Sequence, residues 1–333
     1  MEILIKTLEQ VAILVIFIMV GYFFKKHNLI TEDGKKVLAS LLVNLFFPCY
    51  SISSLSSQLD INKIITYIIY ILAGFVLTIC LIFLPYPVAK GIAKNKHENN
   101  ILKYALTFGN IGYFGYPVVG AVFGAQARAL MILFCLPMSI AINTYGYQIL
   151  TEKVDLNGKA LIEDESKPKS FKERFRFLFS VPFIGTILGI VIGLLPFDLP
   201  VFLANDNNTG LLNIAGNCQS VTAMLLTGAV LANTPLKKLF TSFKSYLIGI
   251  IKLVVIPLIV GVVAYLLKYL NVISSEIFMM IVIVSAMPIG MNVVVYPESV
   301  GIDSTEGSKM CFLSYILGLI TVPLVFMLVQ VLM

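Results

Sequence analysis

An apolar stretch long enough to cross a bilayer is interrupted at residues 108–117, which read Phe-Gly-Asn-Ile-Gly-Tyr-Phe-Gly-Tyr-Pro. Pro117 removes a backbone donor and its ring collides with the preceding turn, while Gly112 and Gly115 contribute no packing side chain. Unpaired backbone at membrane depth is tolerated only where protein or a water-filled cavity covers it. This stretch therefore predicts a broken span.

A second break of the same kind lies at residues 286–292, which read Ala-Met-Pro-Ile-Gly-Met-Asn. One such break alone indicates an ordinary proline kink. Two breaks at corresponding places in two halves of a chain are typical of the binding site of a transporter. We therefore interpret the pair as a site.

The composition places the whole chain in a membrane. Of the 333 residues, 58% are hydrophobic and 13% are charged, against about 25% charged in soluble domains. A span needs roughly 20 apolar residues, and such runs occur near residues 4–24, 37–57, 64–89, 101–122, 128–150, 180–197, 211–232, 243–267, 276–297 and 308–332. The interrupted spans are the fourth and the ninth.

The basic residues set the expected orientation. Of the 24 Lys and Arg residues, nineteen follow odd-numbered spans, whereas Lys6, Lys63, Arg128 and Lys268 lie on the other side. Cytoplasmic loops carry the excess of Lys and Arg, so we expect a plasma-membrane protein with both termini outside. The net charge of +6 then points to lipid headgroups rather than to nucleic acid.

The halves of the chain correspond at a nearly constant offset. Four landmark pairs lie 171 to 173 residues apart: Gly21 and Gly193, Asn44 and Asn217, Pro85 and Pro257, and Pro117 and Pro288. Five spans per half is an odd number, so the second half enters the membrane upside down. The predicted organisation is a first five-helix repeat (1–150), a cytoplasmic loop (151–179) and a second, inverted repeat (180–333).

The loop at 151–179 is the longest polar segment, and its end predicts a short interfacial helix. Ser170 and Glu173 form a capping box, and apolar residues follow on one helical face with basic residues on the other. A docking site for a regulatory partner is the weaker alternative.

No catalytic motif is present, so we do not expect an enzyme, and the five cysteines lack metal-ligand spacing. We expect neither a cofactor nor a metal. Lys252 is the one clear charge well inside a span, and we interpret it as a lysine that snorkels to the cytoplasmic interface. Glu298 is expected to be a solvated interfacial residue.

The other polar residues in the spans are amides and hydroxyls. Asn110 and Asn292 flank the breaks, and we expect them to contact the ligand. Half-helix N-termini there suit a carboxylate, because they expose N–H groups and a positive dipole end. For Asn44 and Asn143, interhelical hydrogen bonds and ligand contact are equally good hypotheses; Tyr145 lies beside Asn143.

Residues 108–117, residues 286–292 and the run Val43-Asn-Leu-Phe-Phe-Pro48 resemble the auxin efflux carrier family, and the short central loop is similar to its bacterial malate and malonate permeases. The resemblance covers essentially the whole chain. It implies an all-α fold like that of the plant auxin carriers and the bile-acid symporters. In that fold a ten-span inverted repeat has spans 1, 2, 6 and 7 as a scaffold, and spans 3–5 and 8–10 as a transport domain. The resemblance also implies that the broken spans 4 and 9 cross near their prolines, at the substrate site. Pro-Ile-Gly stands in the ninth span where the family suggests Pro-Pro-Ala.

We therefore predict a secondary transporter of a mono- or dicarboxylate that works by alternating access at a midplane site. The rivals are a sodium-coupled organic anion symporter, a membrane anion receptor without transport, and a channel. A homodimer through the scaffold helices is a further expectation. The predicted substrate-binding residues are Asn44, Asn110, Gly112, Gly115, Pro117, Asn143, Tyr145, Met287, Pro288, Gly290 and Asn292.

Overall fold

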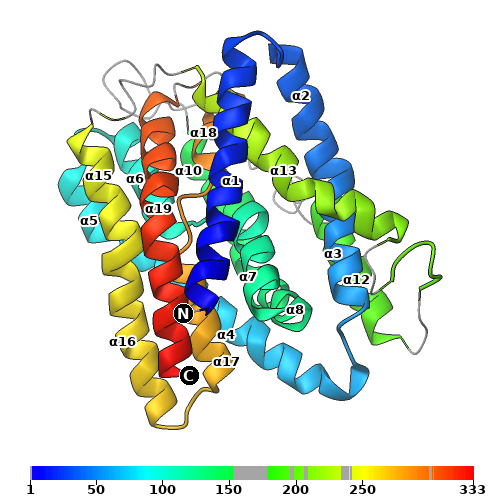
Figure 1. Ribbon diagram of the computed structural model, residues 1–333. Helices are drawn as coiled ribbons and strands as arrows, with labels where there is room; N and C mark the ends of the chain where they lie inside the picture. The colour runs from blue at the N-terminus through cyan, green and yellow to red at the C-terminus, as the bar shows by residue number, and fades with distance from the viewer. Residues whose placement is uncertain are drawn as a thin grey trace, which may run out of the picture.

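The structure is a computed structural model that describes residues 2–152, 179–195, 199–205, 209–233, 240, 242–299, 302 and 304–333. The described residues fold into helices packed as one bundle, with the two termini at the same end (Figure 1). The α-helices and the short π and 3₁₀ segments (η) are α1 (Glu2–Lys26), α2 (Glu32–Leu41), η1 (Leu42–Phe46), α3 (Phe47–Ser56), η2 (Ile61–Lys63), α4 (Ile64–Phe83), α5 (Tyr86–Ile92), α6 (Lys96–Thr107), η3 (Ile111–Gly115), α7 (Tyr116–Phe123), α8 (Ala125–Phe134), α9 (Leu136–Ala141), η4 (Ile142–Gly146), α10 (Tyr147–Leu150), α12 (Val181–Leu194), α13 (Leu211–Leu231), α15 (Phe243–Ile250), η6 (Ile251–Val255), α16 (Ile256–Tyr269), α17 (Ser275–Ser285), α18 (Asn292–Ser299) and α19 (Thr305–Leu332).

The helices identify a multi-pass membrane protein. Among the described residues, six helices are long and apolar enough to cross a bilayer, or seven if the pair 125–134 and 136–150, bent by 49°, is one span. The apolar helices at 111–123, 181–194 and 275–285 are shorter. Each of the ten predicted runs contains helix, but only the longer ones reach the length of a span, so the ten-span repeat stays a prediction.

Glycines let two pairs of helices approach closely. A Cβ on Gly21 of α1 would lie 2.1 Å from the carbonyl oxygen of Leu225 in α13. A Cβ on Gly193 of α12 would lie 2.6 Å from the carbonyl oxygen of Leu55 in α3. Small residues allow such close helix packing in membranes, where lipid is as apolar as leucine. The two landmark glycines thus join α1 to α13 and α12 to α3.

Prolines introduce π turns into three of the helices. The residues before Pro48, Pro117 and Pro257 donate their N–H groups to the carbonyl five positions earlier rather than four. A proline has no N–H to donate and crowds the turn before it, so the helix widens by one residue there. The prolines at positions 117 and 257 therefore widen their helices without ending them.

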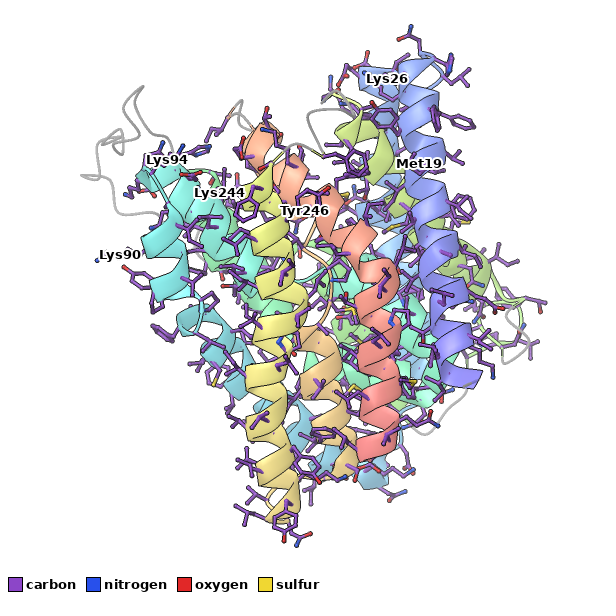
Figure 2. All side chains as sticks on the ribbon, turned by 60° about the vertical axis from the view of Figure 1, so that its left-hand side comes forward. Met19, Lys26, Lys90, Lys94, Lys244 and Tyr246 are labelled. Atoms are coloured by element: carbon purple, nitrogen blue, oxygen red, sulfur yellow. The ribbon has the colours of Figure 1, made fainter. Side chains whose placement is uncertain are left out.

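Apolar side chains cover the outside of the bundle (Figure 2). On α4 and α16 the exposed ones include Ile65, Leu72, Val76, Leu258 and Val262. This surface suits lipid tails, because the tails are themselves apolar and offer no hydrogen-bonding groups. The predicted interfacial helix with Ser170 and Glu173 lies outside the described residues, and so does the side chain of Glu298.

Candidate functional site

The first break lies between α6 and η3. The helix α6 ends at Thr107, and the chain runs extended through Phe108 before η3 begins at Ile111. Asn110 caps the new helix, because its side-chain oxygen accepts a hydrogen bond from the N–H of Tyr113 at 3.2 Å. Its amide nitrogen donates to the hydroxyl of Tyr315 in α19. Both ends of this buried amide are therefore occupied by the protein.

The second break lies between α17 and α18, and α19 supports it as well. The N–H of Ile289 donates to the hydroxyl of Ser314 at 3.0 Å, and that hydroxyl donates to the carbonyl of Cys311 at 2.7 Å. All three side chains are buried. One helix, α19, thus satisfies polar groups at both breaks, as unpaired backbone in a membrane requires.

The two breaks cross and pair with each other. Gly109 and Ile289 form an antiparallel β-bridge. The N–H of Asn110 donates to the carbonyl of Pro288 at 2.7 Å, and the N–H of Gly290 donates to the carbonyl of Phe108 at 3.0 Å. A Cβ on Gly109 would lie 2.7 Å from the Cβ of Met287, so this approach requires glycine.

A cavity of about 300 Å³ lies against the crossing. Both half-helices that start at the breaks, η3 at Ile111 and α18 at Asn292, begin in its wall. Its other walls come from η1, α3, α9, η4 and α12 and include Val43, Phe47, Ser139, Asn143 and Thr186. The first N–H groups of a helix have no partner within the helix and carry its positive dipole end. The cavity thus receives two positive dipole ends, and within them the N–H groups of Ile111, Tyr113, Val293 and Val294 already have acceptors in the chain.

Polar groups in the cavity are uncharged. No Lys, Arg, His, Asp or Glu occurs among the described residues that line it. The Tyr296 hydroxyl donates to the side-chain oxygen of Asn143 at 3.1 Å. Asn292 lies within hydrogen-bonding reach of the Tyr104 and Tyr296 hydroxyls. An amide and hydroxyl lining of this kind can bind a small polar ligand through its hydrogen-bonding groups.

The predicted site residues divide into three groups. Asn110, Gly112, Asn143, Gly290 and Asn292 line the cavity. Met287 and Pro288 lie in the second break, and Gly115 and Pro117 lie in the helix that follows the first break; none of these four residues lines the cavity. The remaining two, Asn44 and Tyr145, do not line it.

For the other two amides, Asn143 and Asn44, the hypotheses are an interhelical hydrogen bond or contact with the ligand. The structure places these two amides differently. Asn143 bonds across helices to Tyr296 and also lines the cavity. The amide of Asn44 donates within its own helix to the hydroxyl of Ser40 at 3.2 Å and is exposed away from the cavity. Both hypotheses for Asn44 stay predictions.

Aromatic residues of the cavity are absent from the sequence prediction. Phe47, Tyr104, Tyr113, Tyr116 and Tyr296 all line it. Three of these tyrosines lie in the interrupted fourth span, at residues 104, 113 and 116, so their position beside the break is a signal that could have found them. Tyr296 carries the same signal, because it lies four residues after Asn292 in the interrupted ninth span, whereas the proximity of Phe47 to the breaks depends on tertiary packing.

The prediction for Lys252 is wrong. Its side chain is fully buried, with no exposed surface, and its amine donates to the carbonyl of Thr107 at 3.2 Å. Thr107 is the last residue of α6, where a helix leaves carbonyls unpaired and carries its negative dipole end. The lysine therefore turns inward to the first break, because the free end of α6 is a nearer partner than the interface.

An ion pair joins the two halves of the chain at the end of the bundle where Lys94 and Lys244 lie together (Figure 2). Lys244 of α15 donates to the carboxylate of Glu98 in α6. Burial raises the pKa of Glu98, but the hydrogen bonds from Lys244 and the Lys94 backbone outweigh it and hold this pKa below its usual value. The pKa of Glu152 is lowered for the same reason. Burial raises it, but the hydrogen bonds from Lys96 and Asn100 outweigh that effect.

Comparisons with known proteins agree with this architecture. A family model described as membrane transport protein matches residues 6–326. An uncharacterized transporter from Methanocaldococcus jannaschii is 28% identical over 129 residues. That match covers 38% of this chain and 42% of the relative, so the chain spans less than half the length of the relative it matches. The family match, by contrast, includes both breaks.

Proposed function

Because the chain belongs to the membrane transport protein family, the family of the auxin efflux carriers that its sequence resembles, we propose that it is a secondary transporter of a small organic anion. The observation that carries the proposal is the meeting of two half-helix N-termini at one uncharged cavity. Such ends bind carboxylates through N–H groups and the helix dipole. The substrate class is a mono- or dicarboxylate.

The transport cycle is alternating access. The cavity extends from the crossing to the start of α12, since its wall includes Ser180, the residue before that helix. With the loop at 151–179 cytoplasmic and both termini outside, this conformation is open to the cytoplasm of a cell bounded by the plasma membrane. At the other end, α3 and α8 are in contact.

The moving unit comprises spans 3–5 and 8–10, and spans 1, 2, 6 and 7 form the scaffold. The close contacts of α1 with α13 and of α12 with α3 support this division, because both fall within the scaffold. They also relate the first span to the seventh and the sixth to the second, as a 5+5 inverted repeat requires. The ion pair of Lys244 with Glu98 joins spans 4 and 8 within the moving unit.

A sodium-coupled symporter is the second candidate within transport. In transporters with broken helices, the carboxyl ends of half-helices and unwound carbonyls coordinate sodium. Here the amine of Lys252 already bonds the carbonyl at the end of α6. That contact favours a carrier that does not need sodium at this place.

Counterflow in proteoliposomes tests the function. Purified protein is reconstituted with one unlabelled carboxylate inside and a labelled carboxylate outside, over a panel of mono- and dicarboxylates. Accumulation of label that depends on the internal anion is the expected result. Binding of a carboxylate to the purified protein without counterflow for any anion of the panel would instead identify a receptor.

A further inference from the structure

An arginine lies at the contact between α3 and α8, in the half of the bundle that also contains the chain termini (Figure 1). Arg128 of α8 places its guanidinium over the ring of Tyr50 in α3, 5.3 Å from the ring centre. Its stem packs on α7, where a Cβ on Gly120 would lie 3.0 Å from the Arg128 Cδ. The contact spans the two proposed units, because α3 belongs to the scaffold and α7 and α8 to the transport domain.

Four buried side-chain polar atoms, three on α3 and one on Arg128, have no hydrogen bond among the described residues. Among the described residues, the side-chain atoms in this condition include Nε of Arg128 and the hydroxyls of Ser51 and Ser54. The hydroxyl of Tyr50 lies beside the guanidinium without a well-formed hydrogen bond. Both serines are fully buried, and positions 50, 51 and 54 fall within about 100° of arc on α3.

Unsatisfied buried groups are rare in native structures and call for an explanation. At an interface between a moving unit and a scaffold, the explanation is that these groups meet water or a ligand in another conformation. They are all hydrogen-bond donors, and the arginine is the one described arginine of the chain. No carboxylate pairs with it among the ion pairs of the described residues.

The chemistry of this group fits a carboxylate. Arginine presents a planar fork of donors that matches the two oxygens of a carboxylate, and hydroxyls supply further donors. Tyr50 also links the group to the cavity, because it lies about one turn along α3 from Phe47, which lines the cavity.

We propose that Arg128, with Tyr50, Ser51 and Ser54, is the carboxylate-binding entry site of the transporter on the side of the chain termini. In the present conformation the Tyr50 ring covers the guanidinium and the site is closed. When the transport domain shifts, the arginine leaves the ring and receives the anion before the anion reaches the uncharged cavity. This inference rests on the proposed function and adds a cation that the cavity itself lacks.

The test is a comparison of transport from the two sides. Proteoliposomes with known protein orientation are used to measure KM and kcat for a transported carboxylate presented on either side. For Arg128→Gln we expect KM on the Arg128 side to rise about tenfold to a hundredfold, the loss expected for one hydrogen bond between charged groups. KM on the cavity side should stay unchanged. Arg128→Lys should restore part of the loss, because it keeps the charge but not the fork.

Lys63→Gln is the matched control. Lys63 is exposed, and it lies in a groove that also contains Gln126, two residues before Arg128. If Lys63→Gln raises KM as much as Arg128→Gln, or if Arg128→Gln changes both sides equally, the entry site is refuted. A wild-type protein without counterflow would remove the proposed function as well, so the two failures are distinguishable.

A second measurement tests the entry site without any substitution of Arg128, so it does not require that an arginine variant folds. Ser54→Cys is placed in a background from which the five native cysteines have been removed, and a membrane-impermeant thiol reagent is applied on the side of the termini. We expect slow labelling that a saturating carboxylate slows further, because Ser54 is accessible only when the site is open. Absence of labelling during active transport would overturn the proposal.

Discussion

The backbone N–H of Asn110 donates a 2.7 Å hydrogen bond to the carbonyl of Pro288, across a separation of 178 positions in the chain. With the reciprocal bond from Gly290 to Phe108, it joins the two interrupted helices at the point where neither has helical partners of its own. Each break therefore satisfies the other, which is the condition for unwound backbone at membrane depth.

Gly109→Ala should separate the two breaks. Its added methyl group would lie 2.7 Å from the Cβ of Met287, and overpacking of this kind costs about 1–3 kcal/mol. We expect a lower unfolding temperature of the purified protein and a loss of counterflow. Gly91→Ala is the control, since a Cβ there meets nothing within 4 Å; equal effects of the two would mean that the crossing is not constrained at Gly109.

Asn292 offers the clearest test of the ligand's charge, because the Asn110 amide is already occupied by Tyr113 and Tyr315. Two unit charges about 4 Å apart repel by about 4 kcal/mol at an effective dielectric constant of about 20. Asn292→Asp should thus weaken carboxylate binding about a thousandfold. Asn292→Ala loses only a hydrogen bond to a charged group, about 1–3 kcal/mol. Binding to purified protein measures both.

The control for this series is Asn44→Asp, which adds the same charge on an exposed residue outside the cavity. It should bind carboxylate like the wild type. The Asn292→Asp defect should diminish at low pH, where the new carboxyl group protonates. If Asn292→Asp binds as well as Asn292→Ala at neutral pH, a cation becomes the better hypothesis for the ligand.

The contact of Lys252 with the end of α6 predicts transport without sodium. Initial uptake into proteoliposomes should be the same when sodium is replaced by choline at equal ionic strength. Lys252→Met should reduce uptake, because the Thr107 carbonyl loses its buried donor. Lys268→Met is the matched control, since Lys268 also donates to backbone carbonyls, but at the chain terminus. Sodium-stimulated uptake by the wild type would favour the symporter instead.

The Glu98 carboxylate predicts a stability that falls in acid. Its pKa in the folded protein lies below the ordinary value of 4.5, so its stabilisation is complete above that value and is lost as the pH falls through the folded pKa. Glu98→Gln should cost about 1–3 kcal/mol at neutral pH and reduce the acid dependence of thermal unfolding. Asp33→Asn removes an exposed pair with Lys36 and should leave both unchanged.

Labelling of single cysteines tests the orientation. Asn157→Cys and Asn207→Cys lie in segments that the structure does not describe, on opposite sides in the predicted topology. The cysteine at position 157 should react with an impermeant reagent only after the membrane is opened, and the one at position 207 should react from outside. Labelling in the reverse order would invert the topology.

The sequence located both breaks because their cause is local. Glycines and prolines at residues 108–117 and 286–292 act on their own turns, and the positions of the cavity-lining residues Asn110, Gly112, Gly290 and Asn292 follow from them. The bridge between Gly109 and Ile289 could not be predicted, because it depends on the distant packing of α6 against α17 and α18. The hydrogen bonds from Tyr315 and Ser314 of α19 to the two breaks could not be predicted from the sequence for the same reason.

Lys252 shows the opposite case, in which a general rule gave the wrong answer. Hydropathy gives the depth of a residue in the bilayer but not the neighbours beside it. The lysine lies at a depth from which snorkelling is expected, but α6 ends next to it and supplies a free carbonyl. For Asn44, too, the sequence did not indicate the partner found in the structure, which is the Ser40 hydroxyl one turn earlier in the same helix.

The crossing is built from main-chain atoms, and this has a consequence for how such a protein diversifies. Apart from the glycine at position 109, the two hydrogen bonds of the bridge need no particular side chain. Substitutions at Ser139, Asn143 or Thr186 can therefore alter the cavity wall while the crossing persists. One architecture can in this way be adapted to new cargoes by changing a few wall residues, which makes these positions the natural targets for redesigning specificity.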